Sequence, residues 1–408
     1  MPNKDRNIPK RRFKEFENAD AWELRKLGEV AEINPKSQIP EKFEYVDLES
    51  VVGTSLISHR TVRAESAPSR AQRLALPGDI FYQTVRPYQK NNYLFDLSDD
   101  NYVFSTGYAQ LRPKIDDRYL MIKIQDDGFV KEVLDRCTGT SYPAINSKDL
   151  SQISIDVPTS LPEQEAIGTF FSTLDRQITL HQRKLDKLKS VKQAYLSEMF
   201  PAEGERVPKR RFPGFTDDWE LRKLGEISTH RGGTAIENHF SEDGKYKVIS
   251  IGSYGLDNKY IDQKIRAVEN EVTRSKVVNK NELTMVLNDK TANGNIIGRC
   301  LLIEADDEFV INQRTEIISF NSVIYPKFAY VVLNGVFREQ VKKIVQGGTQ
   351  IYVNYSSVEQ LYLSLPSLPE QEAIGTFFST LDRHITLHQR KLEKLKNLKK
   401  ALLNELFV

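Results

Sequence analysis

Two long stretches of this chain place apolar residues at alternating intervals of four and three residues. They cover 161–200 and 368–407, and a mean interval of about 3.5 residues is typical of a coiled-coil helix. Pro162 and Pro369, each followed by acidic residues, indicate where the two helices begin. One helix cannot bury its own apolar stripe, so we expect the two helices to pack against each other. The residues that we assign to this helix seam are Ile167, Phe171, Leu174, Ile178, His181, Leu185, Leu188, Ile374, Phe378, Leu381, Ile385, His388, Leu392 and Leu395.

The two helical stretches are also copies of each other. They align without a gap, and 32 of 40 positions are identical. If the helices pair antiparallel with full overlap, Ile167 faces Leu406 and Lys192 faces Leu381. Lys192 and Lys399 then fall in the outer layers of the seam, where a lysine stem can pack while its ammonium group reaches water.

The segments that precede the helices repeat as well. The motif Pro-Lys-Arg-Arg-Phe occurs at 9–13 and again at 208–212, and Trp22–Glu29 returns unchanged as Trp219–Glu226. Repeats of this length indicate two homologous modules rather than a solenoid. We interpret the two tryptophans as core anchors, and the basic runs as either phosphate contacts or solvated linkers.

Short β-type runs interrupted by Gly, Asn, Asp and Pro fill the segments between the repeats. Each segment is long enough for its own core. We therefore predict an α+β protein in which two mixed α/β domains are joined by two long antiparallel helices that form a coiled coil with pseudo-two-fold symmetry. The predicted parts are a basic N-terminal segment (1–21), a first domain (22–158), a first helix (159–200), a linker (201–218), a second domain (219–365) and a second helix (366–408).

The globular segments barely resemble each other, whereas the helices are nearly identical. Two nearly identical helices are thus each attached to a different globular segment. A structural protein has little use for this arrangement, but a protein that reads an asymmetric two-part target requires it.

Composition adds mainly exclusions. The net charge of +2 predicts no global basic field, so any nucleic-acid surface must be local. The chain has no adenine-methyltransferase Asn/Asp-Pro-Pro-aromatic motif, no phosphate loop, no dinucleotide fingerprint and no nucleophile elbow.

His181 and His388 lie in the seam, where a polar residue fixes register more often than it binds a metal. Cys137 and Cys300 lack metal-ligand spacing, and the N-terminus has no apolar targeting segment, so we expect reduced thiols and a cytoplasmic protein.

The repeated motifs resemble those of a known family. Leu-Pro-Glu-Gln-Glu-Ala-Ile leading into Leu-Asp-x-x-Ile-Thr-Leu-His-Gln-Arg-Lys-Leu, together with Trp-Glu-x-Arg-Lys-Leu-Gly-Glu, is similar to the specificity subunits of type I restriction-modification systems over the whole chain. The resemblance implies two target recognition domains, each reading one half of a split double-stranded DNA sequence, and two helices that set the gap. It implies two modification (methyltransferase) subunits and motor-nuclease restriction subunits as partners. S-adenosylmethionine, ATP and magnesium would belong to those partners, and this chain would carry no catalytic residue, metal or cofactor.

The family pattern supplies no base-contacting residues, so these are chosen by side-chain chemistry and loop position. Arginine pairs with guanine, asparagine or glutamine with adenine, and lysine mainly with phosphate. The loop 86–92 is the most prominent cluster. The DNA-binding candidates are Arg60, Arg63, Arg70, Arg73, Gln83, Arg86, Tyr88, Lys90, Asn91, Asn92, Ser141 and Tyr142 in the first domain, and Arg231, Arg274, Lys276, Asn288, Lys290, Asn293, Asn295, Arg314, Gln350 and Tyr352 in the second.

Two other functions stay open on the sequence. The chain could be the specificity subunit of a methylation-only defence complex, which neighbouring genes would reveal. It could also be a non-enzymatic scaffold with two protein-binding domains, and failure to bind any DNA together with its partners would favour that function.

Overall fold

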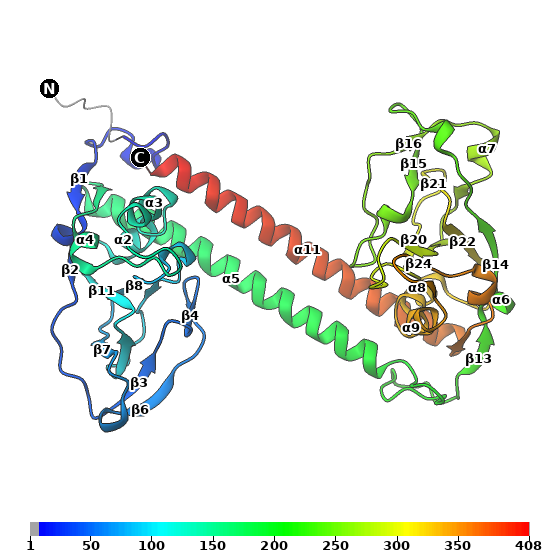
Figure 1. Ribbon diagram of the computed structural model, residues 1–408, viewed down its shortest axis with the longest axis horizontal. Coiled ribbons are helices and arrows are strands. Elements are labelled where there is room, and N and C mark those ends of the chain that lie inside the picture. The colour runs from blue at the N-terminus through cyan, green and yellow to red at the C-terminus, as the bar shows by residue number, and fades with distance from the viewer. Residues whose placement is uncertain (1–7, 408) are drawn as a thin grey trace. The chain divides into compact units, whose positions relative to one another are not determined.

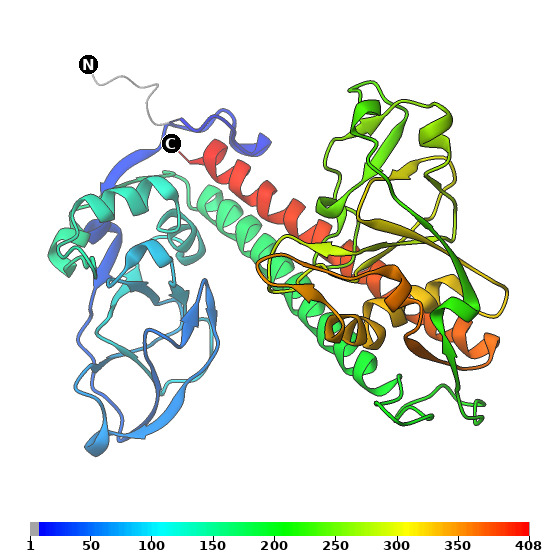
Figure 2. The same ribbon diagram turned by 45° about the vertical axis from the view of Figure 1, so that its right-hand side comes forward.

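The computed structural model describes residues 8–407, which form two compact units (Figures 1 and 2). Unit 1 contains the described residues up to 182 together with those from 390 onward, and unit 2 contains residues 183–389. The two long helices, α5 (Leu161–Glu198) and α11 (Leu368–Leu406), each contribute to both units. Within the described range, no helix combines the length and the apolar content that crossing a membrane requires.

Unit 1 is built from two four-stranded sheets, a two-stranded ribbon, a small hairpin and short helices. One sheet has the order β6-β3-β10-β7, the other β2-β11-β8-β9, and the ribbon pairs β1 with β12 antiparallel. The strands are β1 (Glu23–Lys26), β2 (Ala31–Ile33), β3 (Lys42–Val46), β4 (Val51–Val52), β5 (Ser55–Leu56), β6 (Arg60–Arg63), β7 (Ala71–Leu74), β8 (Ile80–Gln83), β9 (Tyr93–Leu94), β10 (Tyr102–Ser105), β11 (Tyr108–Pro113) and β12 (Ser154–Val157). The short helices are α1 (Leu27–Val30), α2 (Asp117–Lys123), α3 (Asp127–Asp135) and α4 (Ser147–Ser151).

The strand β8 is buried on both of its faces. Ile80 and Tyr82 belong to the cluster around the helices, whereas Phe81 belongs to an aromatic cluster in which it stacks on Phe104 with ring centroids 3.6 Å apart. Because successive side chains of a strand point to opposite faces, this strand connects the two cores of the domain. Its end is therefore a rigid point from which a loop can project.

Unit 2 repeats this plan. A ribbon pairs β13 with β25, and two four-stranded sheets have the orders β14-β22-β18-β20 and β16-β15-β21-β17. A third sheet has three strands in the order β19-β24-β23, whereas unit 1 has only isolated β-bridges from Ala144 to Val85 and Thr138 among the described residues outside its named strands. The strands are β13 (Glu220–Lys223), β14 (Ser228–Gly232), β15 (Tyr246–Ile249), β16 (Arg266–Ala267), β17 (Val277–Val278), β18 (Leu283–Val286), β19 (Asn288–Asp289), β20 (Cys300–Leu302), β21 (Phe309–Ile311), β22 (Thr315–Phe320), β23 (Gln346–Gly347), β24 (Ile351–Tyr352) and β25 (Tyr362–Leu365). The short helices are α6 (Leu224–Ile227), α7 (Glu271–Arg274), α8 (Pro326–Asn334), α9 (Val336–Lys343) and α10 (Tyr355–Val358).

These elements agree with an α+β fold. Strands β8, β12, β15, β18 and β25 lie in the segments where short β-type runs were predicted, and the second of these segments also contains α8 and α9. The tryptophans are core anchors as predicted, since Trp22 and Trp219 are both buried. Both cysteines are free thiols, with Cys300 buried and Cys137 half-buried.

The long helices pack against each other in each unit through the apolar seam. In unit 1, Ile167, Phe171 and Leu174 of α5 share a cluster with Leu402 and Leu406 of α11. In unit 2, the same cluster holds α11 residues Ile374, Phe378 and Leu381 and α5 residues Leu188 and Met199. The pairing within each unit is antiparallel, because early residues of one helix meet late residues of the other.

The outer seam lysines have partners that the sequence interpretation missed. Lys399 Nζ lies 2.6 Å from Asp175 Oδ1 in unit 1, and Lys192 Nζ lies 2.6 Å from Asp382 Oδ1 in unit 2. Each contact is one residue from the predicted antiparallel pairing. The lysines therefore form half-exposed ion pairs instead of simply extending into water.

Candidate functional site

The repeated Glu-Gln pair at the start of each long helix anchors the helix to its domain. Glu163 accepts two hydrogen bonds from the Arg12 guanidinium (2.6 and 2.7 Å) and one from Trp22 Nε1 (3.3 Å). Gln164 accepts a bond from the Asp116 backbone N–H at 3.1 Å. Both charged side chains are almost fully covered, Arg12 to 6 % exposed and Glu163 to 1 %. This contact raises the pKa of Arg12 above its ordinary value, because the carboxylate stabilises the charged form.

The second copy repeats this anchor. Arg211 donates two hydrogen bonds to Glu370 (2.8 and 2.6 Å), and Gln371 accepts one from the Tyr325 backbone N–H (2.9 Å). The Trp219 Nε1 atom, however, is buried without a hydrogen-bond partner. The last arginine of each basic run, Arg12 or Arg211, therefore binds a buried glutamate inside the protein. Neither of these two arginines is a phosphate contact or part of a solvated linker.

A close approach of helices explains the glycine of the same motif. A Cβ atom added to Gly168 would lie 2.7 Å from the Tyr119 backbone nitrogen, at the start of α2. One added to Gly375 would lie 2.8 Å from the Phe328 nitrogen of α8. Only glycine lets these helices approach the long helix so closely. The motif that marks both copies is thus a docking joint between helix and domain.

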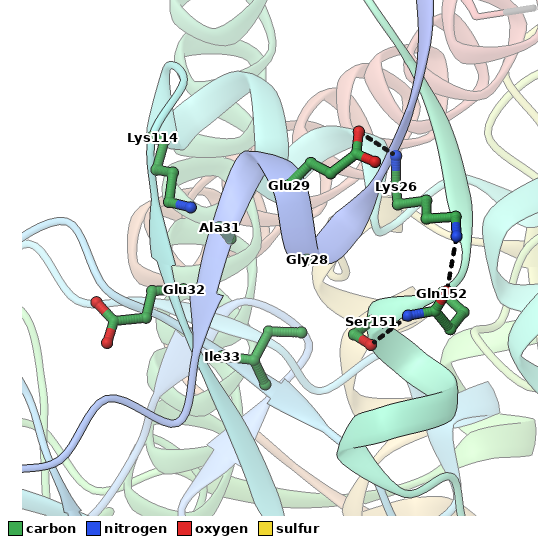
Figure 3. A pocket seen from close by; sticks show the side chains of 9 residues that line it. All are labelled: Lys26, Gly28, Glu29, Ala31, Glu32, Ile33, Lys114, Ser151 and Gln152. Carbon is green, nitrogen blue, oxygen red and sulfur yellow. Dashed lines mark hydrogen bonds between the residues drawn. The ribbon is translucent and has the colours of Figure 1, made fainter.

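The groove in Figure 3 is another repeated joint. It has a volume of about 500 Å³ and is lined by residues of β1, α1, β2 and α4. Lys26 Nζ donates to Gln152 Oε1 across it (2.8 Å), and Lys223 Nζ donates to Gln360 Oε1 in the second copy (3.0 Å). None of the DNA-binding candidates lines this groove. A larger hollow of about 730 Å³ lies between β9 and α5 in unit 1 and is also free of them.

The loop after β8 brings several of the candidates together in unit 1. Val85 forms a β-bridge with Ala144, so the loop lies beside the turn that contains Ser141 and Tyr142. The Arg86 guanidinium lies over the Tyr142 ring, 4.4 Å from its centroid. Tyr142 is 62 % exposed and Tyr88, in the same loop, is 51 % exposed. Arg86 and Tyr142 contact each other, Tyr88 is exposed in the same loop as Arg86, and Ser141 directly precedes Tyr142. We call these four residues the unit 1 cluster (Arg86, Tyr88, Ser141, Tyr142).

Four other candidates, at the end of β8 and in the loop that follows, make contacts inside the protein. Gln83 and Asn92 are buried (3 % and 1 % exposed), and Asn92 Oδ1 accepts a hydrogen bond from the Gln83 backbone N–H (2.8 Å). Lys90 Nζ donates to Asp127 Oδ1 (2.5 Å) and to the Gln125 carbonyl (2.8 Å). Gln83 and Asn92 therefore do not expose their side chains in this structure, and their assignment as base contacts stays a prediction. Asn91 Oδ1 accepts from the Gly53 backbone N–H (2.8 Å).

The other candidate arginines of the first domain lie on or next to the sheet β6-β3-β10-β7. Arg60 and Arg63 are exposed on β6, and Arg60 lies over the Tyr45 ring at 5.2 Å. Arg70 is exposed before β7. Arg73 is half-buried in β7, where burial lowers its pKa and leaves its Nε atom unpaired. Within residues 8–407, no hydrogen bond, ion pair or ring contact links these four arginines to the unit 1 cluster.

The corresponding position in unit 2 holds a different set of side chains. Asn288 of β19 pairs with Tyr352 of β24. In the amide orientation that satisfies both of its neighbours, Asn288 accepts a hydrogen bond from Arg314 Nη1 (2.8 Å). Tyr352 and Gln350 are exposed beside them. We call these residues the unit 2 cluster (Asn288, Arg314, Gln350, Tyr352).

The remaining candidates of the second domain are divided between paired and open side chains. Arg231 forms an ion pair with Glu282 (2.8 Å), Arg274 pairs with Glu269 (3.2 Å), and Lys276 Nζ donates to the Gly232 carbonyl (2.8 Å). Lys290, Asn293 and Asn295 are exposed in the loop that follows β19. Among residues 8–407, no group of three or more His, Cys, Asp or Glu is placed to hold a metal ion.

Comparisons with known proteins agree with the family resemblance. The family described as "Type I restriction modification DNA specificity domain" matches residues 19–190 and 216–397. The type I restriction enzyme MjaVIII specificity subunit of Methanocaldococcus jannaschii is 24 % identical over 315 residues, covering 74 % of this chain and 72 % of the relative. The putative MjaX specificity subunit of the same organism is 21 % identical over 430 aligned residues, covering 98 % and 96 %.

One solved structure supports the fold. The crystal structure of a type I restriction-modification system S subunit from M. genitalium superimposes with a TM-score of 0.66, covering 98 % of this chain and 99 % of that one. Its sequence identity is 16 %, so the likeness concerns the fold alone.

Proposed function

Because the chain belongs to the type I restriction-modification DNA specificity family, we propose that it is the subunit that selects the DNA target of a methyltransferase and restriction complex. The observation that carries this proposal is a contrast within the chain. The helix anchors are duplicated almost residue for residue, whereas the unit 1 cluster and the unit 2 cluster are unlike. Two unlike clusters of Arg, Asn, Gln and Tyr suit two different half-sites.

In this proposal the target is bipartite and asymmetric, and the chain itself is not catalytic. The first recognition domain comprises 22–158 and the second 219–365, with the basic segment 1–21, the linker 201–218 and the helices 159–200 and 366–408 as scaffold. The duplicated helices would dock two modification subunits, and motor-nuclease subunits would add to that core. S-adenosylmethionine, ATP and magnesium would be bound by those partners in the cytoplasm, where the DNA lies.

The first experiment is methylome sequencing of a host that expresses the full chain with its modification subunits. We expect one new methylated sequence made of two specific halves separated by a fixed, non-specific gap. A methylome without any new motif, together with failure of the complex to bind DNA, would favour the scaffold function. Methylation without restriction, and no co-purifying nuclease subunit, would identify a methylation-only complex.

The second experiment tests whether the helices set the gap. Each long helix rises 1.5 Å per residue, so removing the matched heptads 178–184 and 389–395 shortens the pair by roughly 10 Å, or about three base pairs. We expect the gap to shrink by about three base pairs while both half-site sequences stay the same. An unchanged gap in a folded, active variant would contradict the proposal that the length of the helices sets the gap between the half-sites.

A further inference from the structure

The loop after β8 has an unusual backbone that is held at both ends. Arg86 and Lys90 both adopt the left-handed conformation, with φ of 54° and 55°, around the short 3-10 helix Pro87–Gln89. Non-glycine residues rarely adopt this conformation unless their surroundings impose it. The Arg86 backbone N–H donates to the Pro143 carbonyl (2.8 Å) at one end, and the Lys90 side chain binds Asp127 at the other. The position of Arg86 is thus fixed by the fold.

The Arg86 side chain contacts an aromatic ring, but its hydrogen-bond donors are unused within the described residues. Its guanidinium lies over the exposed Tyr142 ring, and among residues 8–407 it has neither a hydrogen-bond acceptor nor a carboxylate partner. Arg231 and Arg274, by contrast, are both neutralised by glutamates. A guanidinium that stacks on a ring through its face keeps its in-plane N–H groups available to an external acceptor.

We propose that Arg86, stacked on Tyr142, reads a guanine in the major groove of the half-site bound by the first recognition domain. This inference rests on the proposed DNA-recognition function. Guanine presents two acceptors, O6 and N7, on its major-groove edge, and they match two parallel N–H groups of one guanidinium. Tyr142 supplies the stacking surface, and Lys90 is a positioning residue that acts through the loop backbone.

The chain provides a matched control for this assignment. Arg60 also lies over a tyrosine ring in the same domain, 5.2 Å from the Tyr45 centroid. Tyr45 is buried, however, and Arg60 projects from a regular strand, β6, instead of from a fixed left-handed loop. Arg60 can attract phosphate through its charge, but it lacks the preorganised loop and the exposed ring of Arg86.

The test uses the full chain in complex with its modification subunits and a library of double-stranded DNA with both half-sites randomised. The wild-type complex defines the base preference at each position. For R86A we expect the preference for guanine at one position of one half-site to fall roughly 5- to 150-fold, as for loss of a bidentate base contact. The other half-site, which reports that the complex is folded, should be selected as before.

Three further variants distinguish recognition of the base by Arg86 from the effect of its positive charge and from the support of its loop. R86K keeps the positive charge but not the planar fork, so most of the guanine preference should be lost while the salt dependence of binding stays close to wild type. K90M should lower the preference at the same position by a smaller factor. R60A removes a positive charge that can attract phosphate, so it should weaken binding to all sequences alike and leave the preference at the Arg86 position unchanged.

The outcomes separate this inference from the function on which it rests. A wild-type preference at every position in R86A, or loss of the same guanine in R60A, would overturn the role of Arg86 while DNA recognition stands. A wild-type complex that selects no sequence at all would overturn both.

Discussion

The contacts at the start of the two long helices are nearly the same in both units, whereas the loops after β8 in unit 1 and around β19 in unit 2 carry different side chains. At the joints, Arg12 with Glu163 and Arg211 with Glu370 form the same two-bond contact, in which both carboxylates are buried. At the strand ends, unit 1 places an arginine over a tyrosine, and unit 2 places an asparagine beside an arginine. The chain keeps its mechanical contacts the same and varies the side chains that face outward.

This difference explains why the repeated motif at the start of α5 and α11, although it is the clearest pattern in the sequence, makes contacts inside the protein. Glu163, Gln164 and Gly168 are each fixed by a partner inside the protein: a buried guanidinium, a backbone N–H and a closely packed helix. A second copy of the domain needs the same partners, so the motif repeats. A base contact has no such internal partner, and its identity depends only on the target.

The largest predicted effect tests whether the two joints are equivalent. Glu163→Ala leaves Arg12 buried without its carboxylate, which should lower the free energy of unfolding by about 3 kcal/mol. Glu370→Ala should cost about 1 kcal/mol less, because Glu163 also accepts the Trp22 N–H whereas Trp219 Nε1 has no partner. Chemical denaturation of the full-length variants measures both changes.

Two exposed glutamates, each two residues after the buried glutamate of its helix, provide the controls for these variants. Glu165→Ala and Glu372→Ala remove a carboxylate that faces solvent, so each should change the free energy of unfolding by less than about 0.5 kcal/mol. Equal losses for Glu163→Ala and Glu370→Ala would show that the tryptophan hydrogen bond contributes nothing to the difference between the units.

A smaller effect is expected for the ion pairs that flank the seam. Lys399→Met removes the partner of Asp175, and Lys192→Met removes that of Asp382. Both pairs are partly exposed, so each change should cost roughly 0.5–1 kcal/mol at low salt and less at high salt. Lys396→Met, on an exposed position of α11, is the control and should have no measurable effect. Unequal losses in denaturation at low salt would contradict the equivalence of the two seam ends.

The sequence predicted those parts of the fold that depend on periodicity and repetition. The alternation of four and three residues located α5 and α11, and residues such as Phe171 and Phe378 are fully buried as a seam requires. The partners of the seam lysines were missed because Asp175 and Asp382 lie one residue off the apolar stripe, where an acidic residue looks like ordinary surface. Their recurrence at the same position of both copies was the available signal.

The candidate site was harder to predict, because composition does not distinguish a paired side chain from an open one. Arg86 and Arg231 look alike in the sequence, yet Arg231 is bound to Glu282, a residue 51 positions away. Gln83 and Asn92 sit in a polar loop, but the loop folds back so that they support its backbone. Only long-range contacts decide which of these side chains faces outward.

The smallest predicted effect concerns pH and the support of the unit 1 cluster. Hydrogen bonding and attraction from Lys90 lower the pKa of Asp127 below its ordinary value. A carboxyl group whose pKa is lower in the folded state stabilises that state above its unfolded pKa of about 4, and this contribution is lost as the pH falls through the folded pKa. Denaturation of wild type and Asp127→Asn should therefore show a difference in stability at pH 5 that shrinks towards pH 3. A stability difference that stays constant from pH 5 to pH 3 would mean that the Lys90–Asp127 contact does not hold the loop in solution.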